Sequence, residues 1–287
     1  MTTNVGFEVE IKDWDSFISL TNEFDVGSPF RSAYVFRGQA RDDWFLIPSL
    51  LRHAKSKGID SEQTLKLEEE ALKEFYEQAH LYLPDRVTPE RREELLGWWS
   101  LMQHYNVPTR LLDWTESPLV AAYFAVEQHP DDTGAVWVVH VPTVKKYMEK
   151  VSLKHEVPRS VEARKQAFSD PHAKPNLYFI SRTIQTDRMG AQQTVSTASN
   201  QILADHGQVI ADSAVDKRTF SKLIIPNTLK FKFLHKLRKM NITARTLFPG
   251  IDGLGRSVAE LVRLGAYYYG GGGGGTKPKA EAKSESA

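Results

Sequence analysis

The chain opens with one helical and one extended pattern of hydrophobic positions. Apolar residues recur at helical spacing from Trp14 to Ile18, directly after Asp13, whose carboxylate is a good helix cap. This pattern predicts a short amphipathic helix that begins at Trp14. Residues 32–37 are then rich in residues that favour extended structure and predict a strand, which Gly38 is expected to end. The arginine before that glycine would stand at the tip of the strand, facing a cleft.

Three further stretches predict helices that pack on a core. Ser61 begins a segment with one apolar face, and Pro84 is expected to end it. Thr88-Pro89 combines a capping residue with a first-turn proline and predicts a helix that has His104 in its last turn. Ser117-Pro118 is a second such pair. It opens an alanine-rich apolar segment, so this third helix is expected to be buried.

The second half of the chain alternates strand and helix patterns irregularly. The apolar run at residues 134–141 predicts a central strand that is covered on both faces. Weaker strand patterns lie at 177–180, 193–196 and 223–225, helices are predicted after Asn227 and after Gly255, and a polar, irregular excursion is predicted at 154–176. This order lacks the regular rhythm of a doubly wound sheet and favours an α+β fold with a mixed sheet flanked by helices.

Composition sets the size of the domain. The chain has 287 residues, of which 41% are hydrophobic, enough to bury the core of one large domain. Beyond residue 266 three tyrosines lead into polyglycine and a polar end with nothing apolar to bury. Residues 1–266 are therefore expected to form the domain and residues 267–287 a disordered tail.

Charge and cysteine content exclude several classes of function. Thirty-seven basic and thirty-six acidic residues leave a formal net charge of +1, which gives no global field for a polyanion. Basic residues from Lys230 to Lys239 alternate with phenylalanines and predict a solvated helix face, so no strong nucleic-acid signal is present. The absence of cysteine excludes disulfides and cysteine-ligated zinc, and no other metal motif occurs, so no metal is predicted.

Hydrophobicity along the chain also bears on its location. The N-terminal residues lack the basic-then-apolar order of a signal peptide, and no stretch approaches the roughly 20 apolar residues of a membrane span. We therefore expect a cytoplasmic protein without a membrane partner.

Three polar clusters are candidates for chemistry. The first is Phe36-Arg37-Gly38-Gln39, in which an arginine at a strand end can offer its planar fork to a carboxylate or phosphate. An arginine paired with a neighbouring aspartate is an equally good interpretation of this cluster. The third cluster, residues 187–194, contains Arg188 and Gln192, and a plain loop is the favoured interpretation for it.

The second cluster joins residues 103–105 to residues 108–115 and packs ionisable groups between apolar ones. Within it, the favoured interpretation is that Arg110 and Asp113 pair with each other. His104 is more often a structural histidine than a base, but the end of a helix would favour its charged form.

Taken together, these residues resemble the FRG domain, a family named for its Phe-Arg-Gly triplet. The matching segments are residues 34–39, 103–105, 108–115 and 122–125, supported downstream by 187–188, 192–193, 222–226, 247–249 and 252–254. On these segments the resemblance spans most of residues 7–262. The family occurs in bacteria and their viruses, often without an assigned activity.

A second, weaker similarity is to ADP-ribosyltransferases, whose fold this chain would share. It implies that Arg37 holds the phosphate or ribose of NAD, the candidate substrate. In those enzymes a glutamate stabilises the positive charge that forms on the ribose. The glutamate motif is absent here, so either Asp113, Glu116 or Asp187 takes the role or the site binds without catalysing.

Two functions remain open from the sequence. The first is an NAD-using enzyme, an ADP-ribosyltransferase or NAD glycohydrolase, that acts as a toxin or in antiviral defence. The second is a non-catalytic module that senses a nucleotide or binds a protein partner with the same pocket. For the first, the candidate catalytic residues are Arg37, His104 and Asp113, and the candidate ligand-binding residues are Gln39, Thr109, Arg110, Thr115, Arg188 and Gln192.

Overall fold

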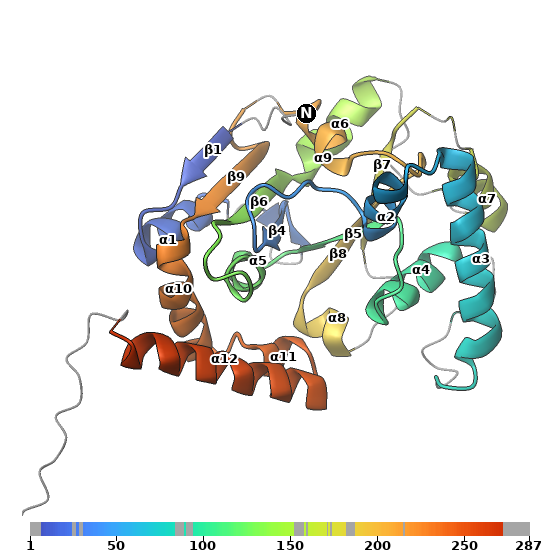
Figure 1. Cartoon of the computed structure of the whole chain (residues 1–287). Coiled ribbons are helices and arrows are strands. Elements are labelled where there is room, and N and C mark those ends of the chain that lie inside the picture. The colour runs from blue at the N-terminus through green and yellow to red at the C-terminus, as the bar shows by residue number, and fades with distance from the viewer. Residues whose placement is uncertain are drawn as a thin grey trace, which may run out of the picture.

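The computed structural model places one mixed seven-stranded sheet at the centre of the molecule (Figure 1). It describes residues 7–24, 27–28, 31–83, 89, 94–151, 158, 160–170, 172, 174–181, 187–214 and 216–271. The strand order is β1-β9-β6-β4-β5-β8-β7, and among the described strands only β1 and β9 pair in parallel. The strands are β1 (Phe7–Glu10), β4 (Tyr34–Gln39), β5 (Leu111–Thr115), β6 (Gly134–His140), β7 (Leu177–Ser181), β8 (Thr194–Ser199) and β9 (Phe220–Ile225), with a separate small pair β2 (Gly27–Ser28) and β3 (Arg31–Ser32). The α+β prediction is confirmed.

Helices are interspersed between the strands along the chain. They are α1 (Trp14–Asn22), α2 (Ser49–Lys57), α3 (Ser61–Ala79), α4 (Leu95–His104), α5 (Pro118–Val126), α6 (Val141–Lys150), α7 (Val161–Phe168), α8 (Asp187–Ala191), α9 (His206–Ala211), α10 (Asn227–Lys239), α11 (Ala244–Leu247) and α12 (Ile251–Tyr269). The predicted caps act as expected: Asp13 accepts a hydrogen bond from the Ser16 amide, and Ser117 accepts one from the Val120 amide. No helix in the described part of the chain is both long and apolar enough to cross a membrane.

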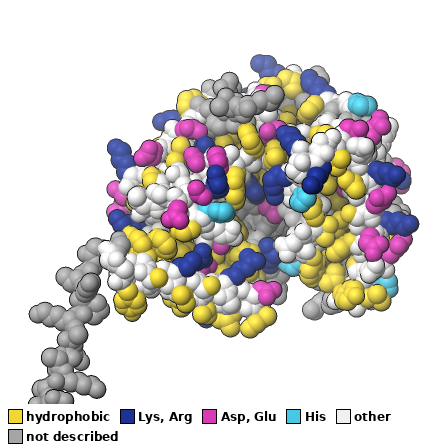
Figure 2. All heavy atoms as spheres, viewed as in Figure 1, with side chains coloured by type: hydrophobic (Ala, Val, Ile, Leu, Met, Phe, Trp, Pro, Cys, Tyr) yellow, Lys and Arg dark blue, Asp and Glu magenta, His cyan; other side chains and the backbone are white. Residues whose placement is uncertain are grey.

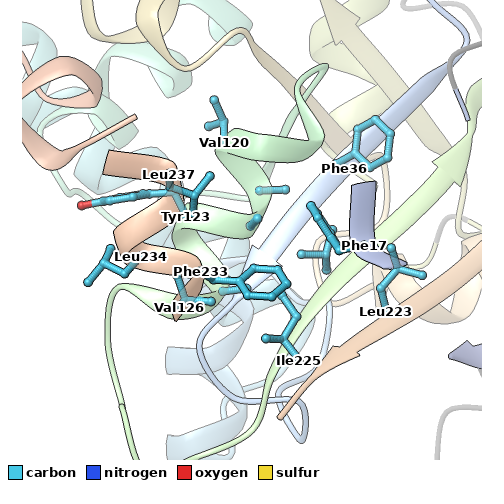
Figure 3. Packing of buried hydrophobic residues seen from close by; sticks show 14 of the residues in the cluster. Phe17, Phe36, Val120, Tyr123, Val126, Leu223, Ile225, Phe233, Leu234 and Leu237 are labelled. Carbon is cyan, nitrogen blue, oxygen red and sulfur yellow. The ribbon is translucent and has the colours of Figure 1, made fainter. Parts of the chain in front are cut away.

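Two groups of helices cover one face of the sheet. Helices α1, α5 and α10 bury their apolar side chains against β4, β6 and β9, and Leu264 of α12 joins the same cluster; Figure 3 shows its centre around Phe36 and Phe233. Helices α3, α4 and α7 form a second cluster with β5, β7 and β8. Helices α6 and α9 pack on the opposite face against Val35, Leu112 and Trp137. The boundary between the first two groups therefore runs over β4 and β5.

The strands on either side of this boundary are only weakly paired. Strands β4 and β5 share the single register pair Phe36 and Thr115, whereas β4 pairs with β6 at all six of its residues. Beyond Phe36 the backbones of β4 and β5 diverge, and the carbonyl groups of β5 must find other donors.

Gly38 lies inside β4 and does not end it, so the prediction of a strand end there was wrong. It pairs with Val136, and a Cβ atom at Gly38 would stand 1.9 Å from the carbonyl oxygen of Ala121 in α5. The glycine is needed because the backbone of α5 approaches the strand too closely for any side chain. Phe36 is buried in the adjoining core, so two residues of the triplet have packing roles.

Other boundaries differ from the predicted ones. Helix α4 begins at Leu95; Pro89 is not helical and Thr88 lies outside the described residues. Helix α7 falls within the stretch that was predicted to be irregular, and α8 replaces the predicted loop at residues 187–191. Helix α12 begins at Ile251, before Gly255, and reaches Tyr269, three residues past the predicted end of the domain. Residues 272–287 of the predicted tail lie outside the described residues.

One lysine of α10 contradicts the predicted solvated face. Lys230 is 1% exposed, and its Nζ donates to the carbonyl oxygens of Ala40, Gln128 and His129 at 2.6, 3.2 and 2.8 Å. Burial lowers its pKa to about 8. This side chain ties the loop after β4 to the loop between α5 and β6.

Candidate functional site

A small polar pocket opens at the boundary between the two helix groups. Its volume is about 40 Å³, and its lining residues are Ser100, Gln103, His104, Leu111, Asp113, Arg188, Gln192 and Thr194. They come from α4, β5, α8, the loop residue Gln192 and the first residue of β8. In the view of Figure 2 the surface is hollowed near its centre, and basic side chains gather around the hollow. Of the predicted site residues, His104, Asp113, Arg188 and Gln192 line this one pocket.

Asp113 is held on three sides. Its Oδ1 accepts a hydrogen bond from Ser196 Oγ at 2.9 Å, and its Oδ2 accepts one from Gln103 Nε2. Its backbone carbonyl accepts the Arg37 Nη1 donor at 2.7 Å. Ser196 is the register partner of Asp113 across β5 and β8, so both side chains stand on the same face of the sheet. The carboxylate is thus fixed in one orientation.

Thr109 is connected to this carboxylate through an amide. Its Oγ1 donates to Gln103 Oε1, while Nε2 of the same amide donates to Asp113. The Thr109 backbone in turn exchanges hydrogen bonds with Ser49 at the start of α2. Thr109 is fully buried and does not line the pocket, so the structure gives it a supporting position.

His104 and Arg188 form the other wall. Arg188 Nη1 donates to the backbone carbonyl of His104 at 3.3 Å, and its guanidinium lies 4.7 Å from the ring of Phe248. Burial and the charge of Arg188 lower the pKa of His104, which favours the neutral imidazole. This direction is opposite to the one expected from the helix end, because desolvation and the Arg188 charge both disfavour the imidazolium.

Arg37 stands behind the pocket. Its register partner in β6 is Trp137, whose side chain belongs to the core on the opposite face of the sheet from the Asp113 carboxylate. The guanidinium supplies the donor that the diverging β4 backbone does not supply to Asp113. Its Nε is buried without a hydrogen-bond partner among the described residues, and burial lowers its pKa to about 10.

Arg110 does not pair with Asp113, and that prediction was wrong. It is 2% exposed, and its Nε donates to both carboxylate oxygens of Glu68 on α3, at 2.8 and 3.0 Å. Its Nη2 forms an ion pair with the same carboxylate, and the guanidinium lies 4.7 Å from the ring of Trp99. Arg110 therefore joins α3 to β5 and does not line the pocket.

Gln39 and Thr115 also have partners away from the pocket lining. The Gln39 amide accepts from Trp137 Nε1 at 2.6 Å and donates to the carbonyl of Phe45 at 3.1 Å. Thr115 Oγ1 donates to the carbonyl of Gln192 at 2.7 Å and so fixes the residue that lines the pocket. Gln192 Nε2 itself donates to the carbonyl of Leu247.

Several pocket residues were missed as site residues. Gln103 and Thr194 belonged to noted clusters without a role, and Ser100 was not singled out, nor was Ser196, which binds Asp113. Ser100 precedes His104 by one helical turn, and Ser196 follows Thr194 by the period of two that a strand requires, so spacing could have found both. Of the alternative carboxylates, Glu116 does not line the pocket, and the side chain of Asp187 lies outside the described residues.

The described residues contain no group of three or more His, Cys, Asp or Glu side chains that could hold a metal ion. Residues 32–134 match the family model of the FRG domain. The chain carries an FRG domain. The matched segment includes the Phe36-Arg37-Gly38 triplet, α4 and β5, whereas the FRG model does not reach Arg188 or Ser196. Comparison with curated proteins and with solved structures gives no match.

Proposed function

We propose that the pocket of Asp113 binds NAD and breaks its nicotinamide bond, as an ADP-ribosyltransferase or an NAD glycohydrolase does. The observation that carries the proposal is that a fixed carboxylate, a guanidinium and an imidazole meet in one pocket: Asp113, Arg188 and His104. Ionisable groups that meet in a cleft are a feature of catalytic sites.

Each side chain has a role in this reaction. The bond between ribose C1′ and the nicotinamide nitrogen breaks, and its electron pair leaves with nicotinamide. Positive charge then develops on the ribose, and the Asp113 carboxylate stabilises it electrostatically. Water or an acceptor nucleophile adds to C1′, and the proton that it loses passes to the solvent. Arg188 binds a phosphate oxygen, and His104 positions the ribose by hydrogen bonding.

Arg37 acts in this proposal through the backbone of Asp113. The resemblance to transferases implied a direct contact between this arginine and NAD, but its guanidinium is bound to the Asp113 carbonyl at 2.7 Å. We therefore assign Arg37 to the orientation of Asp113 and assign the contact with the anionic ligand to Arg188.

Pocket size limits how much of NAD can enter. A volume of about 40 Å³ is far below the roughly 300 Å³ of an ordinary ligand site. Only the reacting centre of a dinucleotide would approach Asp113, and the remainder would lie outside the pocket. Binding of the whole molecule requires movement of side chains such as Arg188.

The test is NAD turnover by the purified chain, followed as nicotinamide release. Asp113→Asn should lower turnover about 100-fold or more while NAD affinity changes little, because the amide keeps the shape and loses the charge. Arg188→Gln should weaken NAD binding about tenfold. Asp252→Asn, at an exposed carboxylate on α12, is the matched control and should leave both quantities unchanged. Equal turnover in the Asp113→Asn and Asp252→Asn variants would reject the assignment.

A second candidate function is ligand sensing without catalysis. Both oxygens of the Asp113 carboxylate already accept hydrogen bonds, and the pocket is small, which favours a site that recognises a ligand and leaves it intact. In this case NAD or another nucleotide raises the unfolding temperature of the wild-type chain, and no nicotinamide is released. A protein partner would then bind the ligand-bound form of the chain.

The expected cellular role depends on whether the protein consumes NAD or only senses a ligand. An enzyme that consumes NAD in the cytoplasm would stop growth, as a toxin or as a defence against viral infection. Expression of the wild-type chain should then arrest cells and deplete their NAD, and the Asp113→Asn variant should do neither.

A further inference from the structure

Helix α12 buries a mostly polar side and exposes an apolar one. Its buried residues recur at helical spacing along one side: Gly253, Ser257, Glu260 and Leu264. The opposite side, named here the outer face, consists of six apolar residues that are 43–79% exposed: Ile251, Leu254, Val258, Leu261, Val262 and Tyr269. An amphipathic helix normally buries its apolar side against the domain. Helix α12 is turned the other way.

Polar contacts hold the buried side of α12 in place. The Glu260 carboxylate accepts a hydrogen bond from the Tyr123 hydroxyl of α5. Arg238 Nη1 of α10 donates to Ser257 Oγ at 3.2 Å. Rotation of the helix to bury its outer face would break these contacts and leave the Glu260 carboxylate in solvent. Cover for the outer face is therefore expected from outside the domain.

The outer face has the residue spacing of a two-stranded coiled coil. Ile251 and Val258 occupy one repeating position, and Leu254 and Leu261 occupy the other, at intervals of three and four residues. A β-branched residue at the first position with leucine at the second favours a parallel pair of helices. The flanking positions carry no charge, so two copies can meet without like-charge repulsion: Gly255, Ser257, Val262 and Leu264.

The outer face is large enough for a stable contact. Its exposed fractions amount to about 700 Å², close to the roughly 800 Å² that each partner contributes to a standard interface. Figure 2 shows hydrophobic side chains along the lower edge of the molecule, where Figure 1 places α12. Residues 272–287 contain no leucine, isoleucine, valine, methionine or aromatic residue, so they are unsuited to cover this face.

We propose that α12 is a dimerisation surface, on which the outer face of one chain packs in parallel against the outer face of a second copy. Ile251, Leu254, Val258 and Leu261 of both copies form the seam, and the two domains lie on opposite sides of the helix pair. The proposal does not depend on NAD turnover, so neither one fails with the other.

Sedimentation equilibrium of the full-length chain, from micromolar to submillimolar concentration, measures the dimer dissociation constant. Val258→Lys places a charge in the seam and should raise that constant about 100-fold or more. Ala259→Lys is the matched control, because it adds the same side chain at the next exposed residue, outside the outer face, and should leave the constant unchanged. Both positions are exposed, so the two variants should unfold at the same temperature as monomers.

A single cysteine tests the direction of pairing, since the chain contains none. Leu254→Cys should form a covalent dimer on mild oxidation, because residue 254 meets its own copy in a parallel pair. Ala266→Cys, exposed on another side of α12, should not. A wild-type chain that stays monomeric overturns the proposal, whether its outer face then binds lipid vesicles or a different protein. So does a Val258→Lys variant that dimerises like the wild type, or a Leu254→Cys dimer that does not cross-link.

Discussion

Arg110 and Arg37 are two buried guanidinium groups of the same domain in opposite surroundings. Arg110 faces the Glu68 carboxylate, which its Nε and Nη2 contact, and its Nη1 donates to the carbonyl of Ser199. Arg37 donates to one carbonyl and keeps an unpartnered Nε. The charge of Arg110 is neutralised by Glu68, whereas burial lowers the pKa of Arg37 to about 10.

The comparison shows that the role of an arginine cannot be assigned from its place in a motif. Both residues stand in segments that resemble the FRG family, and both have partners that hold secondary-structure elements together. Arg110 joins α3 to β5, and Arg37 joins β4 to β5 where their backbones diverge. Loss of Arg110 should therefore cost more stability than loss of Arg37, because only Arg110 leaves a buried carboxylate unpaired.

The largest expected effect is at the Glu68–Arg110 pair. Arg110→Met leaves the Glu68 carboxylate buried and unpaired, which typically costs about 3–5 kcal/mol of unfolding free energy. The double variant Glu68→Leu with Arg110→Met removes both charges and should recover most of that loss. Urea denaturation of the wild type, both single variants and the double variant measures the coupling. Additive losses would show that the two side chains do not act as a pair.

A pH effect of intermediate size is expected at His206, which lies near both arginines. It is 1% exposed, and burial, Arg37 and Arg110 together lower its pKa to about 3. Between pH 6.5 and 3 the unfolded chain therefore binds a proton that the folded chain does not, so stability falls as pH falls in this window. The loss at pH 5 should be about 2 kcal/mol.

His206→Asn isolates that contribution. The asparagine keeps a polar atom near the position from which His206 Nδ1 contacts Thr197 Oγ1 at 3.0 Å, and it does not titrate. The variant should lose less stability than the wild type between pH 7 and pH 5. Parallel pH profiles for the two proteins would contradict the assignment.

The smallest effect is expected at Arg37. Arg37→Met removes a charged hydrogen bond to the Asp113 carbonyl but also removes a guanidinium that is costly to bury. These terms partly cancel, so the unfolding free energy should fall by about 1 kcal/mol. A loss as large as that of Arg110→Met would mean that Arg37 has a carboxylate partner in solution. In the same variant NAD turnover should fall while NAD affinity is retained, as expected for a residue that positions Asp113.

Local signals predicted much of the fold. The caps Asp13 and Ser117, the apolar run of β6 and the α+β class depend on neighbouring residues, and these predictions were confirmed. Errors arose where tertiary contacts decide. Gly38 looks like a strand end in sequence, but the distant backbone of Ala121 determines its role. Lys230 looks solvated, but three carbonyls from two loops enclose it.

The pocket was only partly predictable for the same reason. Asp113 and His104 stand in clusters that the sequence displays, and the structure brings them together with Arg188. The partner of Arg110 could not be chosen from sequence, because Glu68 is 42 positions away and one of several glutamates on α3. Likewise, Ser196 becomes a partner of Asp113 only through the pairing of β5 with β8.

The single register pair between β4 and β5 has a mechanical consequence. The sheet consists of a four-stranded part, β1-β9-β6-β4, and a three-stranded part, β5-β8-β7, each with its own continuous ladder. A small rotation about the Phe36–Thr115 contact would change the angle between the two parts without breaking either ladder. Ligand binding in the Asp113 pocket would then change the orientation of the three-stranded part relative to the four-stranded part. The hydrogen bond from Arg37 to the Asp113 carbonyl would limit the size of that rotation.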